Sequence, residues 1–408
     1  MANSLVVPLF TVEARIKRAL RRHLRQLGFG RSLSGELALP GHSKDSLRAL
    51  HYAQRQQRLR CERRFVRGEW NLLREHFADG KDVDPLMVRP QLELVRAKTW
   101  QSRLFRLASL TWSVPVSQGY GRRLRFLVWD ASNGKLIGLI GLADPVFNLR
   151  ARDEFVGWTV EDRRARLVNV MDAYVIGAIP PYSMLLGGKL IASLVCTAEI
   201  NDVFTHKYSR TRGIISRERK RAVLAMVTTS SALGRSSMYN RLRLPGCRLF
   251  RSVGYTSGWG HFHIPDRLFS KMRDYLRQRG HHYPDNHRYG DGPNWRLRTI
   301  RACLSALELN PDLLRHGIAR EVFVCELAAN ARAFLAGAAA HPELTDLPRI
   351  EEMTAAASAR WIMPRSSRRP EFGTWQREQL FGHLQVNPRR RKQMAASLPK
   401  VVNGTCEL

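Results

Sequence analysis

The sequence predicts an α/β protein in which a mixed β-sheet core is flanked by helical regions on both sides. Two strand patterns joined by Asn133-Gly134 predict a β-hairpin, because this dipeptide favours a type I′ turn. A third apolar run, 168–179, predicts a central strand that ends at the proline pair 180–181. Helical periodicity dominates 11–77 and returns over 295–340. Strands and helices in this order require a layered α/β core.

Three parts of the chain follow from these patterns. We expect a basic helical module over 1–100, an α/β core over 101–280, and a mostly helical region with a basic tail over 281–408. Strands are predicted at 124–130, 135–142, 168–179, 222–228 and 249–255. Helices are predicted at 11–27, at 184–196 with Ser183 as its cap, from Thr197 onward, at 236–243, and at 266–279 with Gly280 as its end.

The charge of the chain points to a polyanionic partner. Among 408 residues, 67 Lys+Arg stand against 35 Asp+Glu, which gives a net charge of +32. Residues 1–100 hold 20 basic and 10 acidic side chains, and residues 201–300 hold 20 and 6, so these two regions carry most of the excess. Such a surface attracts nucleic acid. We expect a nucleic-acid partner, DNA rather than RNA; the alternative is a basic surface that only aids solubility.

Composition and motif searches exclude several other classes. Hydrophobic residues make up 44% and charged residues 25%, as in ordinary globular proteins, which excludes a disordered chain. The apolar stretch 173–196 is broken by prolines, glycines and Lys189, so we expect no membrane span and a cytoplasmic protein. No phosphate-binding loop of the GxxxxGK[ST] type, no GxSxG and no HExxH is present. The cysteines are scattered singly, without CxxC pairs: Cys61, Cys196, Cys247, Cys303, Cys325 and Cys406.

Hydroxyl and amide side chains alternate with arginines between residues 230 and 243. These groups are the usual ligands of phosphate oxygens, and Gly234 before a predicted helix leaves backbone N–H groups for the same purpose. A basic run at 217–221 lies just upstream. The candidate nucleic-acid-binding residues are Arg217, Arg219, Lys220, Arg221, Ser230, Arg235, Ser236, Ser237, Asn240, Arg241 and Arg243. The alternative is that the serines cap helices.

The candidate catalytic residues are Tyr239, His261 and His263, and the sequence leaves open whether the chain is an enzyme. Tyr239 could act as a general acid or as a nucleophile, or it could be a buried tyrosine with a structural hydrogen bond. His261 and His263 share one face of a predicted strand, a spacing that can bind a divalent metal. With Tyr275 they resemble the motif of HUH endonucleases, which implies, as an alternative function, an enzyme acting on DNA: a metal-dependent nuclease or a transposition factor. The structural alternative is a hydrogen-bonded pair of histidines at a sheet edge. Among the core acids, Asp172 on the central strand is the candidate for metal-dependent chemistry.

The order of the core elements resembles the acetyltransferase fold of the GNAT superfamily. The hairpin WDASNGKLIG (129–138) is similar to its central hairpin, and the strand at 170–179 with a glycine-bearing helix start is similar to its cofactor-phosphate segment. Residues 238–242 and 253–255 are similar to its closing motif. The superfamily's glycine-rich loop is replaced here by YSMLLGGK (182–189). This resemblance implies, as an alternative function, group transfer from an acyl cofactor.

Longer motifs resemble the DruA family of the Druantia anti-phage defence system. They are PPYSMLLGGKL (180–190), TTSSALGRSSMYNRLRL (228–244), GYTSGWGHFHIP (254–265), GDGPNWRLR (290–298) and LLRHGIAREVFV (313–324). The resemblance implies phage defence or mobile elements as the setting, with other defence-system proteins as partners. Together with the charge, it leads us to expect a nucleic-acid-binding component of such a system.

Overall fold

The computed structural model describes residues 11–31, 37–39, 41, 43–117, 119–209, 222–247, 249–285, 293–345 and 347–386. The chain divides into two compact units. The described residues of the smaller unit fall within Met1–Gln54 and Ser257–Ala319, and the larger unit comprises Arg55–Thr256 and Arg320–Val386. No helix among the described residues combines the length and the apolar character needed to cross a bilayer.

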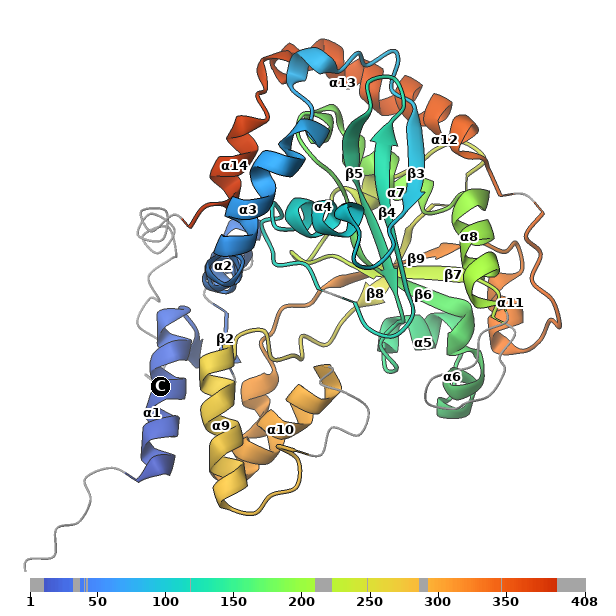
Figure 1. Ribbon diagram of the computed structural model, residues 1–408. Helices are drawn as coiled ribbons and strands as arrows, with labels where there is room; N and C mark the ends of the chain where they lie inside the picture. The colour runs from blue at the N-terminus through green and yellow to red at the C-terminus, as the bar shows by residue number, and fades with distance from the viewer. Residues whose placement is uncertain are drawn as a thin grey trace, which may run out of the picture. The chain divides into compact units, whose positions relative to one another are not determined.

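A seven-stranded mixed sheet forms the centre of the larger unit (Figure 1). Its strands are β3 (Pro90–Leu94), β4 (Arg123–Asp130), β5 (Lys135–Ala143), β6 (Val170–Ala178), β7 (Met226–Ser230), β8 (Arg251–Tyr255) and β9 (Glu321–Glu326). They lie in the order β3-β4-β5-β6-β7-β9-β8. Among the described strands of this sheet, β6 and β7 are the one parallel pair. The predicted mixed α/β architecture is therefore confirmed.

Helices cover both faces of this sheet (Figure 1). The larger unit contains α3 (Arg63–Leu73), α4 (Trp100–Ser109), α5 (Arg150–Val156), α6 (Val160–Arg166), α7 (Gly187–Leu194), α8 (Ala198–Tyr208), α11 (Ala331–Ala336), α12 (Ile350–Ala357), α13 (Met363–Arg368) and α14 (Glu378–Leu384). On one face, α3, α4 and α14 bury apolar side chains against Leu127 and Leu139. On the other, α7, α8 and α12 pack over Phe126 and Ile140. Leu127 and Phe126 are consecutive on β4, as alternation along a strand requires.

The smaller unit is mainly helical. It contains α1 (Val12–Gln26), the short strands β1 (Gly30–Arg31) and β2 (Leu37–Ala38), α9 (Asp266–Gln278) and α10 (Pro293–Ala306), while α2 (Lys44–Cys61) crosses the division at residue 54. Thr11 caps α1 by accepting the N–H of Ala14, and Ile16, Leu20 and Leu24 form the buried stripe that the sequence predicts. The α9 helix follows its predicted bounds closely.

The predicted helix over 184–196 is wrong at its start. Residues Tyr182–Leu185 form a 3-10 turn, Leu186 adopts a left-handed conformation with φ of 61°, and α7 begins only at Gly187. A Cβ atom at Gly187 would lie 2.6 Å from the carbonyl oxygen of Tyr182, so this close approach requires glycine. Ser183 therefore does not cap the helix.

Two strands occur where the sequence predicts helices. β3 lies within the N-terminal region, and β9 lies inside 295–340 between β7 and β8. Residues 322–325 of β9 are all buried, so this strand is a continuous apolar run, which periodicity alone does not distinguish from a buried helix. The helical interpretation of these two segments is therefore wrong.

Candidate nucleic-acid interface

Residues 230–243, called the arginine segment from here on, run from the last residue of β7 through the 3-10 turn at Tyr239–Arg241. The predicted helix over 236–243 is therefore wrong, because only this short turn forms there. The carboxylate of Glu321, at the start of β9, holds this segment in place. It accepts the backbone N–H of Ser236 at 2.8 Å and two contacts from Asn240 Nδ2, at 3.0 and 2.8 Å. Glu321 is only 3% exposed, and a buried carboxylate requires such donors. One side chain of the sheet thus fixes the loop that carries the arginines.

Three arginines of the segment, Arg235, Arg241 and Arg243, are exposed. Within the part of the chain that the structure describes, their guanidinium groups make no ion pair and no hydrogen bond. Other exposed arginines of this protein do find carboxylates: Arg150, for example, pairs with Glu154 at 2.7 Å. The arginine segment therefore presents positive charge that these described side chains do not neutralise.

Lys189 on α7 adds a further cation beside Arg241. Its Nζ donates to the carbonyl oxygen of Arg241 at 3.2 Å and lies 5.2 Å from the ring centre of Trp361. Burial lowers the pKa of Lys189, and the charges of Arg241 and Arg360 lower it further. Like charges gathered in this way favour an anionic ligand, which would relieve their repulsion.

A pocket of about 760 Å³ lies between the arginine segment and the edge strand β8. Asn240, Arg243 and Ser252 are among the residues that line it. Tyr239 also borders the pocket, but only 8% of its surface is exposed. The concave surface therefore adjoins Arg243 of the arginine segment and not an open tyrosine.

Tyr239 is placed as a core residue. Its ring packs against Phe250 and Phe323, with centroid distances of 5.3 and 4.9 Å, and its hydroxyl forms a hydrogen bond with Thr229. Burial raises the pKa of Tyr239. These contacts match the structural alternative considered for this tyrosine, and a catalytic role for it stays a prediction.

The remaining predicted phosphate ligands differ in their surroundings. Ser230 is exposed at the end of β7, and Ser237 is exposed as well. Ser236 is buried, and its hydroxyl accepts the N–H of Tyr239 at 3.2 Å. Asn240 uses its amide for Glu321. Arg217, Arg219, Lys220 and Arg221 lie outside the described residues.

His261 and His263 lie in a turn and not on the predicted strand. The N–H of Ile264 donates to the carbonyl oxygen of His261 at 3.0 Å and closes that turn. His263 Nε2 donates to the carbonyl oxygen of Leu313 at 2.7 Å, and burial lowers the pKa of His263 to about 4. Among the described residues, no three His, Cys, Asp or Glu side chains gather closely enough to hold a metal ion.

The tyrosine proposed to act with these histidines has other partners. Tyr275 on α9 donates to Glu13 Oε1 at 3.0 Å and lies 3.1 Å from the carbonyl oxygen of Ala306. The Tyr275 hydroxyl is therefore engaged in hydrogen bonds with Glu13 and Ala306, and it is not free to attack a phosphodiester in this arrangement. The nuclease alternative receives no support from these contacts.

A second polar site, called the fork, lies where β6 and β7 separate. The two strands pair only from Val170↔Met226 to Asp172↔Thr228, although β6 continues to Ala178. Thr228 Oγ1 donates to Asp172 Oδ1 at 2.8 Å. Burial raises the pKa of Asp172 to about 6, against the opposing effects of Thr228 and Arg152. In open α/β sheets, ligands bind where the carboxyl ends of neighbouring strands diverge.

The sequence reasoning names Asp172 but misses Glu321, Thr228 and Lys189 as neighbours of the candidate sites. Glu321 lies 85 residues from Ser236 and 81 from Asn240 in the chain. No local pattern links residues so far apart. The same is true of the contact between Lys189 and Arg241, which are 52 residues apart.

Comparison with known proteins shows the family to which the chain belongs. The model of the Druantia protein DruA family matches residues 41–337, nearly three quarters of the chain. The chain belongs to this family. Druantia protein DruA of Escherichia coli (strain UMEA 4076-1) is 52% identical over 381 residues, which cover 93% of this chain and 94% of that protein. The DruA family prediction, with its setting in anti-phage defence, is thereby confirmed. No solved structure matches the chain significantly.

Proposed function

We propose that this chain is the nucleic-acid-binding component of its defence system, and that it contacts the phosphate backbone through the arginine segment. The observation that carries the proposal is the set of exposed guanidinium groups of Arg235, Arg241 and Arg243, which make no ion pair and no hydrogen bond with the residues that the structure describes. Glu321 holds the segment that carries them, and Lys189 lies beside Arg241. Guanidinium groups bind phosphate oxygens by charge-assisted hydrogen bonds. DNA is the expected ligand, and other proteins of the defence system are the expected partners.

The positioning of the arginines matters as much as their charge. A net charge of +32 attracts any polyanion over a Debye length, without choosing where it binds. The contacts of Glu321 with Ser236 and Asn240 order the turn that carries Arg241. Arginines on an ordered turn lose less conformational entropy when they bind phosphate than arginines on a free chain.

A binding titration with matched variants tests this proposal. The triple variant R235A/R241A/R243A is compared with R150A/R279A/R369A, in which three exposed arginines with carboxylate partners are removed. Both variants lose three positive charges. We expect the first to weaken binding to duplex DNA, single-stranded DNA or RNA about tenfold or more at 0.15 M salt, and the second to change it by less than about threefold. Equal losses in the two variants would mean that total charge alone governs binding.

A second candidate function is group transfer at the fork, in a core of the GNAT type. The order of hairpin, β6, glycine-bearing α7, β7, Tyr239 turn and β8 supports that arrangement, as does the separation of the parallel pair at Asp172. The backbone N–H groups of Ser183 and Met184 already donate to Ile179 and Pro181, which leaves fewer amides for a cofactor phosphate. Incubation with acetyl-coenzyme A tests it: binding or acyl transfer that is lost in D172N supports the fork, and no binding by the wild type rules out this cofactor.

A further inference from the structure

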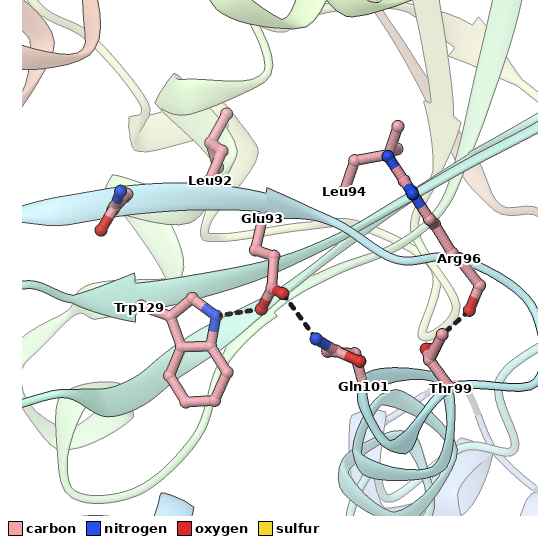
Figure 2. A pocket seen from close by; sticks show the side chains of 8 residues that line it. Leu92, Glu93, Leu94, Arg96, Thr99, Gln101 and Trp129 are labelled. Atoms are coloured by element: carbon pink, nitrogen blue, oxygen red, sulfur yellow. Dashed lines mark hydrogen bonds between the residues drawn. The ribbon is translucent and has the colours of Figure 1, made fainter.

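In the strand order of the sheet, β3 lies at the opposite end from β8, which borders the pocket at the arginine segment. A second pocket, of about 800 Å³, lies beside β3 (Figure 2). It is bordered by the edge strand β3 and by the first turn of α4, which Thr99 caps. Glu93, Arg96, Gln101 and Trp129 supply its polar and aromatic lining.

The carboxylate of Glu93 is the central polar group of this pocket. Its Oε2 accepts Trp129 Nε1 and its Oε1 accepts Gln101 Nε2, each at 2.8 Å (Figure 2). Among the described residues, no arginine or lysine pairs with Glu93. Two neutral donors thus fix the orientation of the carboxylate but leave its charge uncompensated, and each oxygen keeps a lone pair for a further donor. A ligand with two adjacent N–H groups would donate one hydrogen bond to each oxygen of this carboxylate.

Aromatic rings gather beside this carboxylate. Trp129 lines the pocket, and its ring centre lies 6.2 Å from that of Trp100. Trp100 is 38% exposed and stacks on His76, with centroids 4.7 Å apart and planes inclined by 15°. Tryptophan at a surface beside a polar pocket offers a stacking face, and a stacked base gains affinity from such a face whatever its sequence context.

We propose that this pocket binds an unstacked nucleobase, with the base beside Trp129 and its N–H donors on the carboxylate of Glu93. Arg96 at the rim supplies a cation for the attached phosphate. Guanine presents two adjacent donors, N1–H and N2–H, that match the two carboxylate oxygens. Thymine and uracil present one N–H between two carbonyl groups, which the carboxylate repels.

This inference goes beyond backbone binding, because it concerns base identity and strand state. A base inside a duplex is stacked and paired, so the pocket requires a single-stranded or flipped nucleotide. A protein that joins phosphate contacts at one edge of the sheet to a base pocket at the other would prefer single strands that contain guanine. Mononucleotides reach the pocket without any polymer, which separates this site from the arginine segment.

Calorimetric titration with GMP and UMP tests the pocket directly. We expect GMP to bind at least about tenfold more tightly than UMP, and E93Q to lose most of that preference, since glutamine cannot accept at both positions. Removal of the indole in W129L should weaken both nucleotides. Gln is close to Glu in shape, and an unchanged circular dichroism spectrum confirms that E93Q is folded. Equal binding of GMP and UMP, or no binding of either, overturns the proposal.

A polymer experiment separates failure of the pocket from failure of backbone binding. Oligothymidine and the same oligomer with one guanine have equal charge and length. We expect the guanine-containing strand to bind more tightly to the wild type and equally to E93Q, while R235A/R241A/R243A weakens both strands. If both strands bind equally to the wild type and the arginine variant still weakens them, the pocket is refuted and backbone binding stands. If the arginine variant binds both strands as tightly as the wild type but the guanine preference remains, backbone binding through the arginine segment is refuted and the pocket stands.

Discussion

Glu321 accepts both of its contacts with Asn240 through a single amide nitrogen, Nδ2, at distances of 3.0 and 2.8 Å. The two residues lie 81 positions apart, one on β9 and one in the turn that follows β7. β9 also pairs directly with β7, so strand and turn are tied together at both ends of the arginine segment. The carboxylate thus restrains the turn that carries the exposed arginines by bonding it to a strand of the sheet.

Substitution of Glu321 distinguishes the effect of arginine positioning on nucleic-acid binding from the effect of net charge. E321Q makes the protein one unit more positive, so charge alone predicts tighter binding of nucleic acid. We expect weaker binding instead, by about threefold or more, because the turn loses a charge-assisted acceptor, a change on the order of 2 kcal/mol in folding free energy. Fluorescence anisotropy with labelled DNA and a urea unfolding curve measure the two effects.

Glu326 provides the control for this variant. It lies on the same strand, its carboxylate pairs with Arg251, and E326Q changes the net charge equally. We expect E326Q to bind nucleic acid at least as tightly as the wild type. If E321Q also binds as tightly as the wild type, Glu321 does not position the arginines.

Asp172 is expected to lower the stability of the protein at neutral pH. Burial raises the pKa of its folded-state carboxyl to about 6, above the ordinary value of 3.8. Folding therefore disfavours the ionised form, and this cost is present above pH 6 and disappears as pH falls toward 4. D172N should stabilise the protein at pH 7.5 by on the order of 2 kcal/mol, since the amide can still accept Thr228 Oγ1. Urea unfolding at pH 7.5 gives the value.

The buried Asp130 supplies the opposite case. Its carboxylate accepts the N–H of Arg89 and of Ser132, and the hydroxyl of Tyr182. D130N should therefore destabilise the protein, because an amide accepts fewer hydrogen bonds. A destabilised D172N would contradict the prediction for Asp172 and would show that its carboxyl stabilises the fold.

The smaller unit should lose stability in acid through His263. Its folded-state pKa is lowered to about 4 by burial, while the unfolded chain titrates near 6.5. Between these values the unfolded chain binds a proton that the folded chain does not, so stability is complete above pH 6.5 and falls by about 1.4 kcal/mol per pH unit below it. H263Q keeps a donor for Leu313 and removes this titration. Unfolding followed by circular dichroism from pH 7.5 to 5 should show a flatter pH dependence in H263Q, and H282Q, at an exposed histidine, should behave as the wild type.

Local sequence signals were sufficient for part of the fold. The β4–β5 hairpin, the central strand β6 and the amphipathic helices α1 and α9 each depend on neighbours in the chain. The predicted type I′ turn of that hairpin is wrong, because the loop spans residues 131–134 and Gly134, but not Asn133, has a positive φ. β9 has no such signal, because its five buried residues are flanked by helical patterns and its partner β7 lies about 90 residues upstream. β3 is a short edge strand that begins with proline and alternates with Gln91 and Glu93, which weakens its apolar pattern.

The sequence predicts which residue types form the candidate sites, but not which of these residues are free to bind a ligand. Arginines, serines and Asn240 in one short segment indicate phosphate ligands from sequence alone. Which of them are engaged in the fold depends on Glu321, whose contacts are long-range. The pocket at Glu93 could not be found in this way, because β3, α4 and Trp129 come together only in the sheet. Chain topology thus decides which polar side chains remain available to a ligand.

The salt dependence of DNA binding tests the central claim most directly. Each phosphate contact releases condensed counterions, so the slope of log Kobs against log [NaCl] counts the contacts at about 0.7 to 0.9 each. We predict that R235A/R241A/R243A reduces the magnitude of this slope by about 2 to 3, and that R150A/R279A/R369A leaves it within about 0.5 of the wild type. An unchanged slope in the first variant would contradict the account, because the arginine segment would then make no contact with the phosphates.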